Sequence, residues 1–224
     1  MGEMIEVVAA DGHRFGAYRA GPAQSRRGLI VAQEIFGVNQ YIRQCADLFA
    51  GFGFAVIAPA LFDRVEPGVE LRYMAADITR GRALREQMTD AQVLADVTAA
   101  AATLGCEATA MVGYCWGATI AWQVAGAGDL LRAAVGWYGA GIASLRETTP
   151  RCPVQLHFGN QDSSIPPADV QTIRVAQPQV EVNEYFGVGH GFGCEARESY
   201  DANAYDQAQE RTISFLNRFM PPRG

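Results

Sequence analysis

Short apolar segments alternate with longer segments of helical periodicity along most of the chain. The apolar segments predict strands at residues 5–9, 14–18, 28–32, 54–58, 108–114, 133–138, 154–158 and 180–185. Helices are predicted from a cap at Asn39 to about residue 48, and at about 90–104, 116–126, 167–175 and 200–219. Because the central strands are continuous apolar runs that alternate with helices, they indicate a parallel sheet covered on both faces.

Two segments depart from this alternation. The dipeptide Asp11-Gly12 separates the first two strands and predicts a hairpin, and therefore an antiparallel N-terminal edge. The segment from Pro59 to about Arg85 is rich in arginine and is predicted to be irregular. The pattern as a whole predicts one α/β domain over residues 1–224, with a mostly parallel central sheet and helices on both faces.

The charge and composition narrow the classes of function. The formal net charge is -6, so we expect neither nucleic acid nor an anionic membrane as a partner. All 18 basic residues are arginine, which excludes a Schiff-base lysine and the lysine of a phosphate-binding loop. The N-terminus lacks the pattern of a signal peptide and no apolar run is long enough for a membrane span, so a cytoplasmic location is expected. The five cysteines form no C-x-x-C pair, and no metal or cofactor is expected.

The strongest indication of chemistry is Cys115, at the junction of a predicted strand and a predicted helix. Gly113 and Gly117 stand two positions to either side, a spacing typical of the tight turn called a nucleophile elbow, here with Cys in place of the usual Ser. A helix N-terminus favours the thiolate, and the N–H of Trp116 is expected to stabilise an oxyanion. For this motif taken alone, a buried cysteine in a glycine-flanked turn is an equal alternative.

Asp162 and His190 each follow a late predicted strand, at the edge where parallel α/β sheets bind ligands. Either one taken singly reads as an ordinary surface residue. Together with Cys115 they give the order nucleophile, acid, base, which is the chain order of α/β-hydrolases. We therefore predict an α/β-hydrolase fold with Cys115, His190 and Asp162 as its catalytic triad. His157 lies inside a buried strand and is interpreted as a core residue.

Four segments of the chain resemble the dienelactone hydrolase family. They are Gln-Glu-Ile-Phe-Gly-Val-Asn at 33–39, Gly-Tyr-Cys-Trp-Gly at 113–117, Gly-Asn-Gln-Asp at 159–162 and Gly-His-Gly-Phe at 189–192. The resemblance extends over essentially the whole chain. It implies an enzyme that opens the enol-lactone ring of dienelactone to maleylacetate, a step in the breakdown of chlorinated aromatics, without a cofactor or metal.

The resemblance also implies roles for the segment at 33–39. Glu34 would accept the hydrogen bond of the Cys115 thiol and take its proton when substrate binds. Ile35, in the loop after an early strand, would supply the second oxyanion N–H beside that of Trp116. Phe36 is expected to contact the substrate. Without the resemblance, Glu34 would be interpreted as a capping or surface residue.

Of the two substrate-binding arginines that the resemblance implies, this sequence has only one at the expected position. Family members hold the substrate carboxylate with two arginines, and Arg85 matches the first. Cys194 stands where the second belongs, and whether Arg197 replaces it stays open. Tyr138 is expected to bind substrate.

We therefore expect a carboxylic ester or lactone hydrolase that acts on a small molecule through a thioester of Cys115, as a monomer or small homo-oligomer. The missing second arginine favours, as an alternative, a thioesterase or general carboxylesterase of the same fold. A non-catalytic binding or redox-sensing homologue is a further alternative, but a receptor would not need the nucleophile, base, acid and Glu34 together.

Overall fold

The computed structural model describes residues 2–222. The chain divides into two compact units, Met1–Ala110 and Met111–Gly224, which are described in turn. That residues 1–224 act as a single domain stays a prediction. The described residues form eight strands and six α-helices. No helix among residues 2–222 combines the length and the apolar character needed to cross a membrane.

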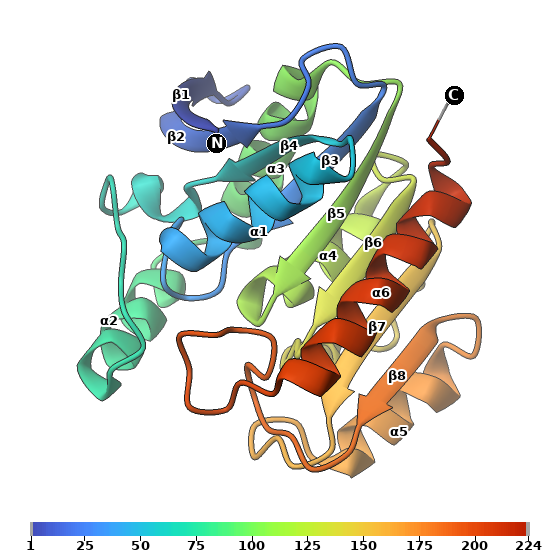
Figure 1. Ribbon diagram of the computed structural model, residues 1–224. Coiled ribbons are helices and arrows are strands. Elements are labelled where there is room, and N and C mark those ends of the chain that lie inside the picture. The colour runs from blue at the N-terminus through green and yellow to red at the C-terminus, as the bar shows by residue number, and fades with distance from the viewer. Residues whose placement is uncertain (1, 223–224) are drawn as a thin grey trace. The chain divides into compact units, whose positions relative to one another are not determined.

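The first unit contains four neighbouring strands in the order β1, β2, β4, β3 (Figure 1). Their bounds are Glu3–Val8 for β1, Arg14–Ala20 for β2, Arg27–Ala32 for β3 and Ala55–Pro59 for β4. The hairpin of β1 and β2 turns at Gly12, whose φ of 85° favours glycine, and β2 also pairs antiparallel with β4. These two antiparallel pairs confirm the predicted antiparallel N-terminal edge, and the pairing becomes parallel between β4 and β3.

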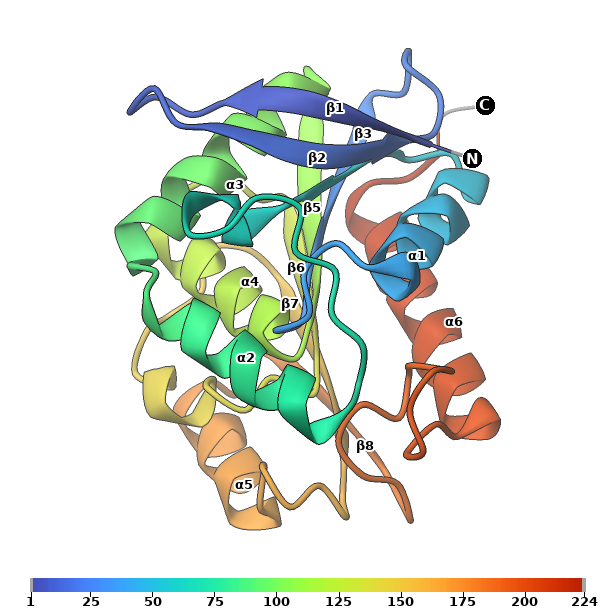
Figure 2. The same cartoon turned by 90° about the vertical axis from the view of Figure 1, so that its left-hand side faces the viewer.

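Two helices cover opposite faces of β3 and β4, as Figure 2 shows. They are α1 (Gln40–Gly51) and α3 (Asp90–Leu104). The predicted cap at Asn39 is confirmed, since its side chain accepts a hydrogen bond from the N–H of Ile42. Helix α3 begins with a capping box of Thr89 and Gln92 and ends at Gly105, whose φ is 62°. The start of α1 and the two ends of α3 therefore follow from local sequence signals.

The prediction of an irregular segment up to about Arg85 is wrong for its second half. After the short 3-10 helix η1 (Leu61–Arg64), the chain forms helix α2 (Ala75–Glu86). Only Gly81 and Leu84 are buried on this helix, so it has almost no apolar stripe. A periodic pattern could not reveal α2, because periodicity reports the burial of one helix face.

Strand β5 (Ala108–Tyr114) runs across the boundary of the units, and the second unit continues with three parallel strands in the order β6, β7, β8. Their bounds are Ala133–Trp137, Val154–Gly159 and Glu181–Tyr185. Helices α4 and α5 lie on one face of these strands and α6 on the other (Figures 1 and 2). Their bounds are Trp116–Ala127, Pro167–Ala176 and Ala202–Phe219, and the 3-10 helix η2 spans Ala143–Leu145. The predicted α/β class, mostly parallel and with helices on both faces, is confirmed.

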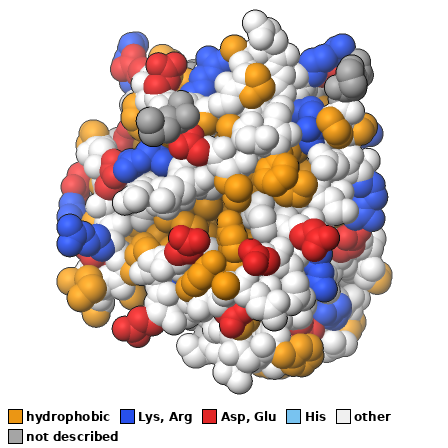
Figure 3. All heavy atoms as spheres, viewed as in Figure 1, with side chains coloured by type: hydrophobic (Ala, Val, Ile, Leu, Met, Phe, Trp, Pro, Cys, Tyr) orange, Lys and Arg blue, Asp and Glu red, His pale blue; other side chains and the backbone are white. Residues whose placement is uncertain are grey.

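Arginine and acidic side chains are interspersed on the face of the molecule seen in Figure 3. This mixed pattern accompanies a formal net charge of -6 over the whole sequence. Mixed surface charge of this kind favours solubility and does not by itself indicate a charged partner.

His157, which lies in β7, connects this strand to α6 through hydrogen bonds. Its Nδ1 lies 2.8 Å from the hydroxyl of Tyr185, and its Nε2 lies 3.0 Å from Oε1 of Gln155 and 3.1 Å from the hydroxyl of Thr212 on α6. The Thr212 hydroxyl also accepts a hydrogen bond from Nε1 of Trp137. A buried polar group with this many partners stabilises a fold, and the interpretation of His157 as a core residue is confirmed.

His157 should make folding stability depend on pH. Burial, with a smaller contribution from Arg211, lowers its pKa to about 3, whereas an unfolded histidine titrates near about 6.5. Protons therefore bind first to the unfolded state, and the stabilisation present above about pH 6.5 is lost as the pH falls toward about 3, at up to about 1.4 kcal/mol per pH unit. Thermal unfolding of parental protein and His157→Gln between pH 7 and pH 5 should give a shallower fall in Tm for the variant. Equal slopes would contradict this account.

Candidate active site

Cys115 occupies a strained turn between β5 and α4. Its φ is 53° and its ψ is -113°, and among residues 2–222 the other non-glycine residue with positive φ is Tyr138. Such a conformation costs on the order of 1–3 kcal/mol and persists only where the surroundings impose it. They do so here, because a Cβ on Gly113 would lie 2.0 Å from the carbonyl oxygen of Gly117. Glycine at position 113 is thus required by close backbone approach, as in a nucleophile elbow.

The three predicted triad residues are in hydrogen-bond contact. Nε2 of His190 lies 3.2 Å from Sγ of Cys115, and Nδ1 of His190 lies 2.7 Å from Oδ2 of Asp162. The Asp162 side chain is fully buried, and its other oxygen accepts a hydrogen bond of 2.8 Å from the N–H of Ser164. The distances from nucleophile to base and from base to acid are those of an activated nucleophile.

The loops that carry the acid and the base are packed on each other. A Cβ on Gly159 would lie 2.4 Å from the carbonyl oxygen of Val188. The same carbonyl accepts a hydrogen bond from the N–H of Gln161, and Oδ1 of Asn160 accepts one of 2.8 Å from the N–H of Gly187. Sequence reasoning identified the motif at 159–162 but not this function of Asn160, which fixes one loop relative to the other.

Electrostatics favour a charged His190. Burial alone would lower its pKa, but the hydrogen bonds to Asp162 and Cys115, with the charges of both groups, raise the pKa to about 10. At neutral pH the imidazole is therefore protonated and lies beside the Cys115 sulfur. A histidinium at this distance stabilises a thiolate.

Two further predicted site residues lie next to the triad. Trp116 is the first residue of α4, and its N–H belongs to the helix terminus at which Cys115 is the cap. The ring of Tyr138 is buried, and its centroid lies 5.2 Å from that of His190 in an edge arrangement. The backbone of Tyr138 has a φ of 43° and its N–H donates to the carbonyl of His157. The second unit thus brings together Cys115, His190, Asp162, Trp116 and Tyr138.

The loop after His190 differs from the arrangement that two carboxylate-binding arginines would give. Cys194 is fully buried. Arg197 is half-buried and its guanidinium packs on the backbone of Gly191, where an added Cβ would lie 2.6 Å from three of its atoms. The hydroxyl of Ser199 donates a hydrogen bond of 2.6 Å to the carbonyl of His190 and closes the loop.

The remaining predicted residues lie in the first unit. Glu34 is fully buried in the loop after β3, so the surface role that its sequence position suggested is wrong. Phe36 is also buried, and its ring centroid lies 4.6 Å from that of Tyr73. Ile35 lies between them, and Arg85 is exposed in the last turn of α2. Buried ionisable side chains are concentrated at functional sites, so the burial of Glu34 agrees with the role that the family resemblance implies.

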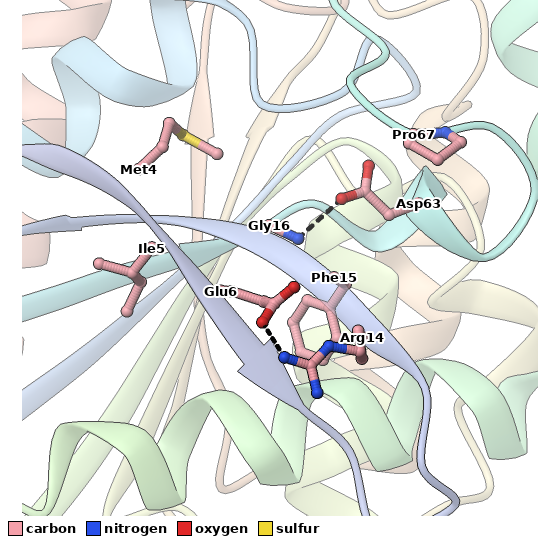
Figure 4. A pocket seen from close by; sticks show the side chains of 8 residues that line it. All are labelled: Met4, Ile5, Glu6, Arg14, Phe15, Gly16, Asp63 and Pro67. Atoms are coloured by element: carbon pink, nitrogen blue, oxygen red, sulfur yellow. Dashed lines mark hydrogen bonds and ion pairs between the residues drawn. The ribbon is translucent and has the colours of Figure 1, made fainter.

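A separate pocket of about 340 Å³ lies at the N-terminal hairpin (Figure 4). Met4, Ile5 and Phe15 supply its apolar lining. Its polar groups are engaged with each other, since Arg14 pairs with Glu6 and Oδ2 of Asp63 accepts a hydrogen bond of 2.7 Å from the N–H of Gly16. The lining contains no cysteine, histidine, serine or threonine, so we assign this pocket no catalytic role.

The fold and the hydrogen-bonded cysteine, histidine and aspartate are characteristic of the α/β-hydrolase class. Within that class, the model of the dienelactone hydrolase family matches residues 15–220, and the chain belongs to this family. The predicted family and the expectation of a hydrolase are therefore confirmed.

Individual relatives agree with this assignment. The chain is 32% identical over 232 residues to a carboxymethylenebutenolidase from Pseudomonas putida, covering 96% of this chain and 95% of the relative. It is 30% identical over 233 residues to another from Pseudomonas sp. (strain P51), covering 98% and 96%. A crystal structure from Klebsiella pneumoniae, whose name places it among the dienelactone hydrolases, superposes with a TM-score of 0.81 at 26% identity, covering 97% of this chain and all of that one.

Cys115 should be the fastest thiol to alkylate. Burial raises the pKa of Cys106 and raises that of Cys152 to about 11, whereas Cys115 lies beside a protonated His190. Brief treatment with iodoacetamide, followed by peptide mapping, should label Cys115 first. His190→Ala should slow this labelling at pH 7 severalfold, because the variant lacks the imidazolium that lies beside the sulfur. Labelling of Cys152 is the internal control, and its modification ahead of Cys115 would contradict the proposed ion pair.

Proposed function

We propose that the protein hydrolyses carboxylic esters or lactones, with an enol-lactone such as dienelactone as the model substrate, through a thioester on Cys115. The observation that carries this proposal is the chain of hydrogen bonds from Cys115 to His190 and from His190 to Asp162. Membership of the dienelactone hydrolase family supports the same class of reaction.

In the first step, the Cys115 thiolate attacks the substrate carbonyl and forms a carbon–sulfur bond. The negative charge moves to the carbonyl oxygen, which the N–H groups of Trp116 and Ile35 stabilise. When the tetrahedral intermediate collapses, the ring carbon–oxygen bond breaks. The leaving oxygen takes the proton of the His190 imidazolium, and the product is a ring-opened thioester.

The second step needs His190 as a base, and the physical origin of its raised pKa explains how it becomes one. Part of the increase comes from the hydrogen bond and the charge of Cys115. Once Cys115 is acylated, that charge is gone, so the pKa of His190 falls. The neutral imidazole, held by Asp162, then takes a proton from water as the water attacks the thioester. Cleavage of the carbon–sulfur bond restores the thiolate beside the imidazolium.

Glu34 completes the proposed cycle as a proton acceptor. As the family resemblance implies, the sulfur would have a second resting position turned away from His190, in which the Cys115 thiol donates a hydrogen bond to the buried Glu34. On substrate binding Glu34 would take that proton as the sulfur turns to its position beside His190, and it would return the proton when the sulfur turns back after hydrolysis. The proposal for Glu34 is supported by its complete burial and by the family resemblance of the segment at 33–39.

A thioesterase or general carboxylesterase of the same fold is the second candidate. The observation that favours it is the burial of Cys194 at the position where the family has a carboxylate-binding arginine. The triad would be unchanged, and only the substrate would differ. Phe36 and Tyr138 remain proposed substrate-binding residues in either case.

Replacement of the nucleophile separates an enzyme from a binding protein. Cys115→Ala should lower turnover by at least about 1,000-fold for every ester that the parental enzyme accepts, because the covalent route is lost. A panel of dienelactone isomers, simple lactones, aryl esters and acyl thioesters measures this. Cys152→Ala is the matched control and should keep parental rates. Parental turnover in Cys115→Ala would refute a cysteine nucleophile.

Arg85 should select substrates that carry a carboxylate. A charge-assisted arginine–carboxylate contact is worth about 1.5 to 3 kcal/mol, so Arg85→Ala should raise KM for dienelactone roughly ten- to a hundredfold and leave KM for a neutral aryl ester unchanged. Arg82→Ala, another exposed arginine of α2, is the control and should change neither. Equal effects of Arg85→Ala on both substrates would assign Arg85 a structural role and favour the broader esterase.

A further inference from the structure

The loop at 33–39, between β3 and α1, is held firmly within the first unit. Oε1 of Gln33 accepts a hydrogen bond of 3.1 Å from the N–H of Leu61. The carbonyl of Phe36 accepts one of 2.8 Å from the N–H of Leu71, and Nδ2 of Asn39 donates to the carbonyl of Leu71. These bonds fix the two ends of the loop and leave Ile35 between them.

Ile35 itself is constrained through the peptide groups on both its sides. Nε2 of Gln33 donates a hydrogen bond of 3.3 Å to the carbonyl of Glu34, which belongs to the same peptide group as the Ile35 N–H. On the other side, α2 presses against the Ile35 carbonyl at Gly81. A Cβ on Gly81 would lie 2.0 Å from that oxygen and 3.2 Å from the Ile35 Cβ, so no other residue fits without a shift of α2 or of the loop.

Most residues of α2 are not buried, so the close contact of Gly81 with Ile35 is an exception on this helix. Besides Gly81, only Leu84 is buried on this helix, and α2 lies apart from β1–β4 in both Figure 1 and Figure 2. A glycine inside a helix weakens it relative to alanine. The chain nevertheless has glycine at the point where the helix meets Ile35.

We propose that Gly81 is a positioning residue, whose missing side chain lets α2 lie against the Ile35 carbonyl and thereby holds the Ile35 N–H in the orientation that stabilises the oxyanion. This inference rests on the proposed function, in which Ile35 supplies the second oxyanion donor. Such a donor must lie about 2.7–3.1 Å from the developing charge, so a small rotation of its peptide group lowers the rate.

The same helix face carries Arg85. Gly81 and Arg85 are four residues apart, and at about 100° per residue their positions differ by about 40° around the helix. The helix face that sets Ile35 therefore also presents the proposed carboxylate-binding arginine. One rigid element would fix both the oxyanion donor and the carboxylate contact, and with them the separation of carbonyl and carboxylate that a substrate must have.

The test compares two glycine substitutions in the full-length protein. Gly81→Ala should lower kcat roughly 10- to 100-fold on charged and neutral esters alike, as expected for a displaced oxyanion donor. KM for a neutral ester and the alkylation rate of Cys115 by iodoacetamide should stay at the parental values, because alkylation passes through no oxyanion. Gly51→Ala, at the end of α1 where an added Cβ meets nothing, is the matched control and should leave all three unchanged.

A second variant covers the case in which Gly81→Ala does not fold. Leu84→Ala removes the other buried anchor of α2 without introducing a clash. It should speed amide hydrogen exchange at residues 35–37 and lower kcat, again with unchanged alkylation of Cys115.

Three outcomes would overturn the role of Gly81: a parental kcat in Gly81→Ala, an equal fall of kcat and alkylation rate, or unchanged exchange at residues 35–37 in Leu84→Ala. Failure of the proposed function is seen separately, as turnover that survives Cys115→Ala in a protein with an intact Gly81.

Discussion

The close approach of the Gly113 and Gly117 backbones is the constraint on which the rest of the site depends. With a side chain at position 113, α4 could not begin directly after β5, and Cys115 would relax from its positive φ. The tight turn puts the sulfur at a helix N-terminus and within 3.2 Å of His190. The helix terminus and the histidinium both favour negative charge on sulfur, so one steric requirement places the Cys115 sulfur where both act on it.

Burial makes this arrangement sensitive to charge. The Asp162 side chain is inaccessible to water and that of His190 is 18% exposed, and charges interact more strongly where water is largely excluded. Each change in the charge of the sulfur is therefore felt by the imidazole. In the proposed reaction, acylation of Cys115 would remove a negative charge, lower the pKa of His190 and so supply the base for the second step. The hydrogen bonds between the loops at 159–162 and 186–190 keep the geometry constant while the charges change.

The sequence predicted those features whose physical cause is local. The α/β class followed from apolar runs, the antiparallel edge from Asp11-Gly12, and the turn at Cys115 from the spacing of its glycines. Helix α2 was missed because two buried residues, Gly81 and Leu84, give no periodic signal. The burial of Glu34 could not be predicted, since a strand end is compatible with core or surface and only the packing of distant segments decides between them.

The triad residues are held tightly in the fold and α2 is held loosely, and this difference determines where substitutions can change substrate choice. Cys115, His190 and Asp162 are held by steric exclusion and several hydrogen bonds, so most substitutions around them cost stability as well as activity. Arg85 is exposed on a helix with two buried residues, where substitutions typically change stability by less than about 0.5 kcal/mol. The exposed residues of α2 can therefore be exchanged at little cost in stability, provided that Gly81 and Leu84 stay. Cys194 is the opposite case, because it is part of the core, and an arginine at this position would require the loop after His190 to repack. A change of substrate is thus physically easier through α2 than through the histidine loop.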